Sequence, residues 1–257
     1  MRLVADVGNT ETVLGLFAPD SLEPRGHWRY STPVPRTSDE LLLLLRSFLL
    51  GAGMEPDRIT GAVVGSVVPA QTELLRVALG TLTGDRVQVL GSAQDLPIRL
   101  DVDAPATVGP DRIANTLAAA HLYERDTVVV DLGTATTYDC ITGDGVFLGG
   151  VIAPGLQAGQ EWLGGRTAML PRVELRAPQR VIGRSTEACL RSGIFYSAVD
   201  AVDGIVDRIR EEWERPDALV VATGGYAGVL VPHSRTVERV EPHLTLVGLE
   251  LVGRARD

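Results

Sequence analysis

The chain has 257 residues, of which 45% are hydrophobic and 22% charged, and its formal net charge is −9. This acidic balance argues against nucleic-acid binding, because a phosphate backbone is recognised by clustered basic side chains. All 24 basic residues are arginines, which disfavours the lysine-dependent Walker A loops, protein kinases and pyridoxal enzymes.

Composition also bears on location. No run approaches the ~20 apolar residues that a membrane span needs, and the first residues lack the order of a signal peptide. Cys140 and Cys189 are the only cysteines and have no metal-ligand spacing, which is typical of a reducing compartment. We therefore expect a cytoplasmic protein with no membrane partner.

The first elements predict a tight β-hairpin. An apolar run over residues 3–5 leads into Asp6-Val7-Gly8-Asn9-Thr10, and a second β-prone run covers residues 12–17. A capping box at Thr37-Ser38-Asp39-Glu40 then predicts a helix to about Leu50. The remaining elements predicted in this half are a strand over residues 61–68, a helix over 69–82 and a strand over 87–90.

The hairpin pattern returns near the middle of the chain. Residues 128–130 lead into Asp131-Leu132-Gly133-Thr134-Ala135, and another β-prone run follows at residues 136–142. The two aspartates are 125 residues apart (131 − 6), close to half the chain. Internal similarity at this spacing predicts two similar α/β domains, over residues 1–115 and 116–257, joined near a helix at residues 113–124.

The second half continues the alternation. Its predicted elements are a strand over residues 147–152, one or two long helices over 185–213 and a buried strand over 218–222. The long helical stretch has an apolar stripe, which either packs on its own sheet or covers a second copy of the chain. The stripe consists of Ile194, Phe195, Ala198, Ala201, Val202, Ile205 and Val206.

The repeated hairpin has a chemical use. Glycine lets the backbone approach a phosphate, amides and hydroxyls donate to its oxygens, and the aspartate holds a metal ion. The same residues also form ordinary turns. Two copies at equivalent strand ends favour contact with the phosphates of a nucleotide.

Two further segments carry candidate chemistry. In Gly109-Pro110-Asp111-Arg112, Asp111 is a candidate proton acceptor and Arg112 a candidate anion ligand, or the two form a surface ion pair. Thr223-Gly224-Gly225 either lets a flat adenine lie on bare backbone or is a structural turn. The residues alone leave both alternatives open.

Together these motifs make the chain resemble the type III pantothenate kinases, members of the acetate and sugar kinase, heat-shock 70 and actin superfamily. The resemblance covers nearly the whole chain and implies two ribonuclease-H-like domains of mixed sheet flanked by helices. Besides the hairpins and residues 109–115, it includes residues 149–155, 167–171 and 223–225.

The resemblance implies phosphorylation of pantothenate to 4′-phosphopantothenate, the first step of coenzyme A biosynthesis, with ATP, Mg²⁺ and potassium or ammonium. Asp111 would be the catalytic base, Gly109, Pro110 and Arg112 would contact pantothenate, and Asp131 would bind the monovalent cation. Thr186 would complete the pantothenate site of the neighbouring subunit in a homodimer. The ATP-binding residues would be Asp6, Val7, Gly8, Asn9, Thr10, Glu11, Thr12, Val13 and Thr134.

Two positions depart from the family pattern. Val102 stands where relatives carry an aromatic substrate contact, and Ser197 replaces a common glycine.

The alternatives to a pantothenate kinase are another small-molecule kinase of the superfamily, a non-catalytic regulator like the Bvg accessory factors, and an actin-like filament protein. Retention of Asp6, Asp111 and Asp131 together disfavours the regulator.

Overall fold

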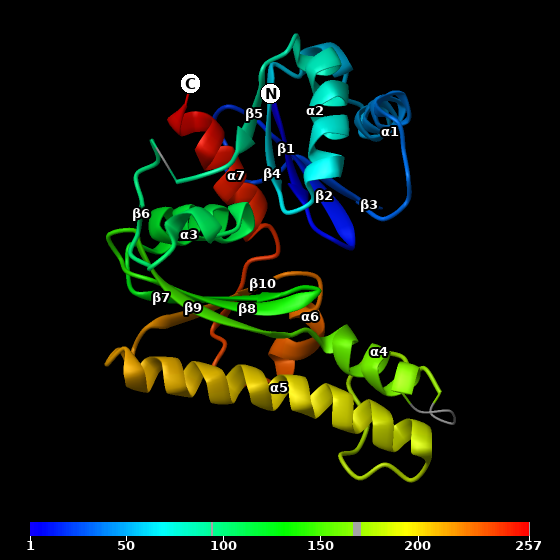
Figure 1. Ribbon diagram of the computed structural model, residues 1–257, viewed down its shortest axis with the longest axis vertical. Helices are drawn as coiled ribbons and strands as arrows, with labels where there is room; N and C mark the ends of the chain where they lie inside the picture. Colours follow the sequence, from blue (N-terminus) through cyan, green and yellow to red (C-terminus); the bar gives the residue numbers. More distant parts are fainter. Residues whose placement is uncertain (94, 167–170, 257) are drawn as a thin grey trace. The chain divides into compact units, whose positions relative to one another are not determined.

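The computed structural model describes residues 1–93, 95–166 and 171–256 and divides into two compact units (Figure 1). Unit 1 comprises Met1–Leu122 with His243–Asp257, and unit 2 comprises Tyr123–Pro242. This division differs from the predicted one, because residue 115 lies inside helix α3 (Pro110–Tyr123). The C-terminal helix α7 (Leu244–Ala255) belongs to the first unit, which no local sequence signal indicated.

The sheet of unit 1 has the strand order β3-β2-β1-β4-β5. Strands β1 and β2 form the predicted hairpin, β3 continues it antiparallel, and β4 and β5 run parallel to β1. The strand bounds are β1 (Arg2–Val7), β2 (Glu11–Phe17), β3 (Gly26–Ser31), β4 (Gly61–Ser66) and β5 (Val87–Leu90).

Helices cover both faces of this sheet. The predicted capping box starts α1 (Ser38–Gly51), which packs with α2 (Pro69–Thr83) over the odd-numbered residues of β1. Helix α7 covers the opposite face, where Leu246 and Leu249 lie over Gly15 and Gly65. Helix α7 also packs on α3, since a side chain at Gly248 would overlap the backbone of Ala114.

Unit 2 repeats the hairpin. Within unit 2 the strand order is β11-β10-β7-β8-β9. Strand β8 runs antiparallel to both β7 and β9, and β10 runs parallel to β7. The strand bounds are β7 (Thr127–Leu132), β8 (Ala135–Ile141), β9 (Val146–Pro154), β10 (Leu219–Thr223) and β11 (Arg239–Val240). The other elements of unit 2 include α4 (Leu156–Arg166), α6 (Ala227–Leu230) and a 3₁₀ turn at Val231–His233. Unit 1 also contains β6 (Arg99–Leu100) and 3₁₀ turns at Pro56–Arg58 and Pro105–Thr107.

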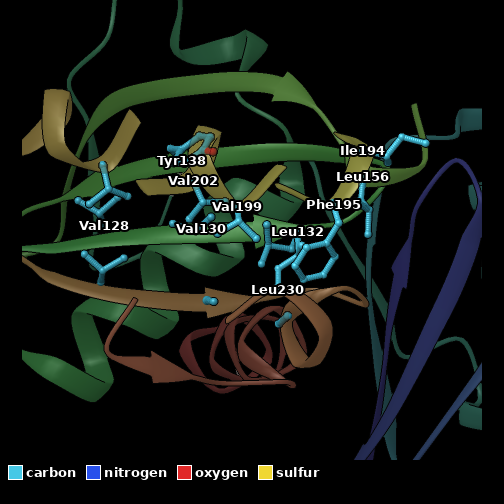
Figure 2. Close-up of a cluster of buried hydrophobic side chains, with 14 of the residues drawn as sticks. Val128, Val130, Leu132, Tyr138, Leu156, Ile194, Phe195, Val199, Val202 and Leu230 are labelled. Atoms are coloured by element: carbon cyan, nitrogen blue, oxygen red, sulfur yellow. The ribbon is translucent and has the colours of Figure 1, made fainter. Parts of the chain in front are cut away.

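One long helix, α5 (Thr186–Glu212), packs on the sheet of unit 2. Figure 2 shows Phe195, Val199 and Val202 of this helix against Val130 and Leu132 of β7. The predicted apolar stripe is therefore used largely inside its own unit. Its buried members Ile194, Phe195, Val202 and Val206 are not available to a second copy.

No helix within residues 1–93, 95–166 and 171–256 combines the length and the apolar character needed to cross a bilayer.

Candidate active site

The first predicted hairpin turn lies at the carboxyl end of β1. Residues 8–10 connect β1 to β2, and the Gly8 amide donates to the Glu11 carbonyl at 3.1 Å. Asn9, Thr10 and Glu11 are exposed, and Asp6 is half-buried one residue before the strand ends. Exposed amides and hydroxyls beside a carboxylate fit the expected contact with phosphates and a metal ion.

Not every residue predicted for this loop presents its side chain. Thr12 is fully buried, and its hydroxyl shares a hydrogen bond of 2.9 Å with that of Thr32. The Thr32 amide in turn donates to the Thr10 carbonyl at 3.0 Å. The Val7 side chain is also in the core. Thr12 and Val7 therefore support the turn, and only their backbone is available to a ligand.

The second predicted segment starts helix α3. Pro110 is the first helical residue and Asp111 the second, so the proline ring fixes the helix start where an amide has no partner. Asp111 and Arg112 are both half-buried. A side chain at Gly109 would overlap the Asp111 carboxylate, so glycine leaves this carboxylate its space.

These two segments lie at the same edge of the unit 1 sheet. Strand β4 runs parallel to β1 with Val7 opposite Ser66, and the Val67 amide donates to the Val7 carbonyl at 3.1 Å. Gly109 adjoins the same residue, because a Cβ there would be 3.9 Å from Val67 Cγ1. Ligands of α/β sheets bind outside the carboxyl ends of the strands, which is where Asp111 and the first hairpin turn occur.

Sequence reasoning missed the end of β4. The Ser66 hydroxyl accepts from Thr72 at 2.6 Å and from the Val68 amide at 3.1 Å, which fixes the turn between β4 and α2. A Cβ at Gly65 would be 3.6 Å from Pro110 Cβ and 2.9 Å from Leu249 Cδ2. Gly65 thus adjoins the start of α3 and Ser66 fixes the turn into α2, and the Gly-Ser pair that ends this apolar strand was the available signal.

The second hairpin turn, in unit 2, is shorter than the first. Only Gly133 and Thr134 connect β7 to β8, and the Gly133 amide donates to the Ala135 carbonyl at 3.1 Å. Thr134 is exposed, and Asp131 is half-buried one residue before the strand ends, like Asp6 in the first copy. The repeated sequence motif therefore forms the same hairpin structure in both units, although the two loops differ in length by one residue.

Glycine turns surround Asp131. Gly224 has a φ of +90°, and a side chain there would overlap the Asp131 carboxylate and come within 2.7 Å of the Leu132 backbone. The Tyr226 amide donates to the Leu132 carbonyl at 3.0 Å. Gly155 lies against the backbone of Gly133 and Thr134. The second hairpin is thus enclosed by backbone from two other loops.

Thr186 is the first residue of α5 and is exposed. Ser185 caps this helix by accepting from the Ala188 amide at 3.2 Å. Val102 is half-buried after β6, and Ser197 is exposed on α5. Of the motif at residues 167–171, residues 167–170 lie outside the described part of the chain.

Metal ions would need ligands beyond clustered side chains. Within the described ranges, no group of three or more His, Cys, Asp or Glu side chains is arranged to hold an ion. Mg²⁺ in phosphoryl-transfer sites is held by one or two carboxylates together with substrate phosphates, so such a cluster is not required.

Comparison with known proteins gives a consistent family. The family model for type III pantothenate kinases matches residues 2–208. A protein of Moorella thermoacetica named type III pantothenate kinase is 42% identical, over 98% of each chain. A protein of the same name from Frankia casuarinae is 44% identical, again over 98% of each chain.

Solved structures share the fold. A ROK-family glucokinase of Streptomyces griseus, in complex with glucose and AMPPNP, superimposes with a TM-score of 0.54 at 13% identity, covering 99% of both chains. A Campylobacter jejuni protein assigned to the Baf family of transcriptional activators has a TM-score of 0.59 at 19% identity, covering 99% of this chain and 98% of its own. These similarities and the two mixed sheets flanked by helices confirm the predicted duplicated α/β fold of the actin-like ATPases.

Proposed function

The chain belongs to the type III pantothenate kinase family and is a kinase that phosphorylates pantothenate, and from this premise we propose which of its residues carry out the transfer. The pantothenate hydroxyl attacks the γ-phosphorus of ATP, the bond to the β-phosphate oxygen breaks, and ADP and 4′-phosphopantothenate result. Catalysis of such a step depends mainly on positioning and charge stabilisation.

Asp111 accepts the proton of the attacking hydroxyl in this proposal. The observation that carries it is the half-buried carboxylate at the start of α3, at the sheet edge where the first hairpin turn also lies. Gly109 and Pro110 fix this carboxylate, and Arg112, whose guanidinium has a forked set of donors, contacts the carboxylate of pantothenate.

The two hairpin turns contact the phosphates of ATP. Residues 6–13 supply backbone amides and the exposed Asn9 and Thr10, and Thr134 supplies an exposed hydroxyl in the second copy. The buried side chain of Thr12 supports the loop rather than the ligand. The Thr223-Gly224-Gly225 turn offers bare backbone to the adenine.

Two cations complete the proposal. Asp6, beside the first phosphate loop, would help to hold Mg²⁺, which neutralises charge on the phosphates when bound. Asp131 would hold potassium or ammonium. Its carboxylate adjoins Gly133 and Gly224 and is a hard oxygen donor, the type of ligand that hard cations prefer.

A homodimer would bring Thr186 to the neighbouring subunit's pantothenate site. The buried stripe on α5 does not support this assembly, but other apolar side chains of unit 2 do. Trp162 on α4, Ile152 on β9 and Ile182 before α5 are 64%, 66% and 82% exposed. Large exposed apolar side chains of this kind are available to an interface with a second copy of the chain. A cytoplasmic location, where ATP is available and Cys140 and Cys189 stay reduced, is part of the same proposal.

One assay tests the function directly. Purified protein is incubated with ATP, Mg²⁺ and K⁺ and, separately, with pantothenate, acetate and a panel of hexoses, and products are identified by phosphorus NMR and mass spectrometry. We expect phosphate on pantothenate alone. Phosphorylated hexose or acetate would indicate another kinase of the superfamily, and no product from any acceptor would indicate a regulator.

A further inference from the structure

The segment before α5 differs in charge from the rest of the chain. Residues 172–191 contain five arginines and two glutamates, a net charge of +3 (5 − 2), in a chain whose formal net charge is −9. Arg172, Arg176, Arg180 and Arg184 recur at every fourth position. In Figure 1 this segment lies beside the N-terminal end of α5.

The same segment and the first turns of α5 enclose a cavity of about 300 Å³. Arg176, Arg180, Arg184 and Arg191 line it, together with Gly183 and Ala188. Its volume is at the lower end of the roughly 300–1,000 Å³ range of small-molecule sites, which suits a compact ligand.

Hydrogen bonds hold this segment on α5. The buried Ser192 hydroxyl donates to the Val181 carbonyl at 2.6 Å, and Arg191 Nε donates to the Glu174 carbonyl at 3.3 Å. At Gly183 a Cβ would come within 2.6 Å of the Ala188 carbonyl carbon, so the chain passes directly against the helix. The segment that lines the cavity is therefore held directly on α5.

The charge in the cavity is only partly neutralised. Arg176 pairs with Glu174 at 2.7 Å and Arg191 with Glu187 at 2.6 Å. For Arg180 and Arg184, both exposed, the described part of the chain shows no carboxylate within ion-pair distance. Arg180 and Arg184 therefore line the cavity without a carboxylate partner, whereas Arg176 and Arg191 each have one.

We propose that this cavity binds a phosphate-bearing small anion. Guanidinium groups bind phosphate through two parallel hydrogen bonds, and arginine is the preferred residue for such recognition. Ala188 lies in the first turn of a 27-residue helix, whose N-terminal end also favours an anion. None of the residues that the proposed function assigns to ATP, pantothenate or a cation lines the cavity, although Thr186 stands between two lining residues, Arg184 and Ala188, so this site goes beyond the proposed function.

Arginine footprinting measures the site without interference from the phosphates bound elsewhere in a kinase. The full chain is treated with phenylglyoxal, with and without pyrophosphate, and modification is read at each of its 24 arginines by mass spectrometry. We expect Arg180 and Arg184 to react freely without the anion and to be half-protected below about 1 mM pyrophosphate. Arg46 and Arg86, which are exposed in unit 1, should react equally in both conditions.

Variants and competitors complete the test. Replacing both central arginines, Arg180→Gln with Arg184→Gln, should raise the half-protecting concentration measured at Arg176 about tenfold. The matched pair Arg46→Gln with Arg86→Gln should leave it unchanged. Inorganic phosphate and AMP in place of pyrophosphate distinguish a bare phosphate from a nucleotide, and protection by either supports the site.

Three outcomes would overturn the proposal. The first is no protection of Arg180 and Arg184 by any of the three anions. The second is protection by pantothenate alone, which would make the cavity part of the substrate site. The third outcome concerns a second copy of the chain, because the exposed Ile182 also adjoins the cavity. If Arg180 and Arg184 are unreactive without anion and react only after dilution to monomer, a second copy covers the cavity.

Discussion

Asp111 and Asp39 occupy equivalent positions, each being the second residue of its helix, α3 or α1. Asp111 is half-buried at the proposed site, whereas Asp39 is exposed. We expect Asp111→Asn to lower kcat about 10²–10⁴-fold, the usual contribution of a general base, while the fold is kept. Steady-state kinetics with a circular-dichroism spectrum measures both.

Asp39→Asn is the matched control, because it removes the same charge from the same helical position and should leave kcat unchanged. If Asp111→Asn retains activity within about threefold of the parent, Asp111 is not the base.

Gly224 and Gly225 are adjacent but differ in what a side chain would meet. A methyl group at Gly224 would need a φ of +90° and would overlap Asp131, whereas one at Gly225 meets nothing within 4 Å. We expect Gly224→Ala to lower the free energy of unfolding by about 1–3 kcal/mol and Gly225→Ala to change it little. Urea unfolding compares the two. Equal effects would show that the Gly224 turn is not constrained.

Asp131 carries the prediction on cations. Replacing K⁺ by a bulky organic cation should abolish turnover at saturating ATP and Mg²⁺, because beside the Asp131 carboxylate Gly224 has no room for even a methyl group, and a bulky cation could not take the place of K⁺ there. Asp131→Ala should be equally inactive and should not respond to K⁺. Full activity of the parent in buffer free of potassium and ammonium would contradict this role.

At the scale of elements, Asp203 ties α5 to the chain that leads into β11. Its carboxylate accepts from Ser234 Oγ at 2.6 Å, the Arg235 amide at 3.0 Å and Thr236 Oγ1 at 2.9 Å. Burial raises the pKa of the Asp203 carboxyl, but these hydrogen bonds outweigh burial and hold the pKa below its ordinary value.

A lowered pKa means that Asp203 stabilises the fold above the unfolded-state pKa of about 3.9, and that this contribution is lost as pH falls through the folded-state value. We expect Asp203→Asn to cost about 1–3 kcal/mol at pH 7, measured by urea unfolding, and less near pH 3. Asp207→Asn, four residues along α5 at an exposed carboxylate, is the control and should change little at either pH. If Asp203→Asn lowered the free energy of unfolding equally at pH 7 and near pH 3, that result would contradict a lowered pKa of Asp203 in the folded state.

Sequence predicted best the elements whose signals are local. The Thr37–Glu40 capping box, Pro69 at the start of α2 and the two glycine hairpin turns each act through neighbouring residues. Helix α7 was missed because it is buried nearly all round and contains two glycines, so it shows no polar face. Strand β3 was missed because only Trp28 and Tyr30 carry its alternating burial, among polar residues and a glycine.

The candidate site could likewise be predicted from the sequence only in part. Its residue types could be found from motifs, since Asp6, Asp111 and Asp131 stand in recognisable turns. Their setting could not, because the edge shared by the first hairpin and α3 depends on the parallel register of β1 and β4, nearly sixty residues apart. The burial of Thr12 likewise depends on Thr32 in another part of the chain.

At the scale of the whole molecule, the proposed homodimer predicts complementation. Asp111→Asn and Thr186→Ala proteins should each be nearly inactive. In an exchanged equimolar mixture, half of the dimers are mixed and each has one intact site of two, so about one quarter of the parent activity should return. Activity is measured against each variant alone. A mixture no more active than its components, or a fully active monomer in sedimentation, would contradict shared sites.

The return of α7 to unit 1 affects how the protein is made. Residues 123–242 are contiguous and have their own hydrophobic cluster, so they can fold as soon as the ribosome has released them. Unit 1 must wait, because α7 is translated after all 120 of those residues (242 − 123 + 1), and until then the sheet face at Val4 and Val63 lacks its helix. At roughly 5–20 residues per second this delay lasts about 6–24 s, during which the nascent chain exposes apolar β-structure to chaperones and proteases.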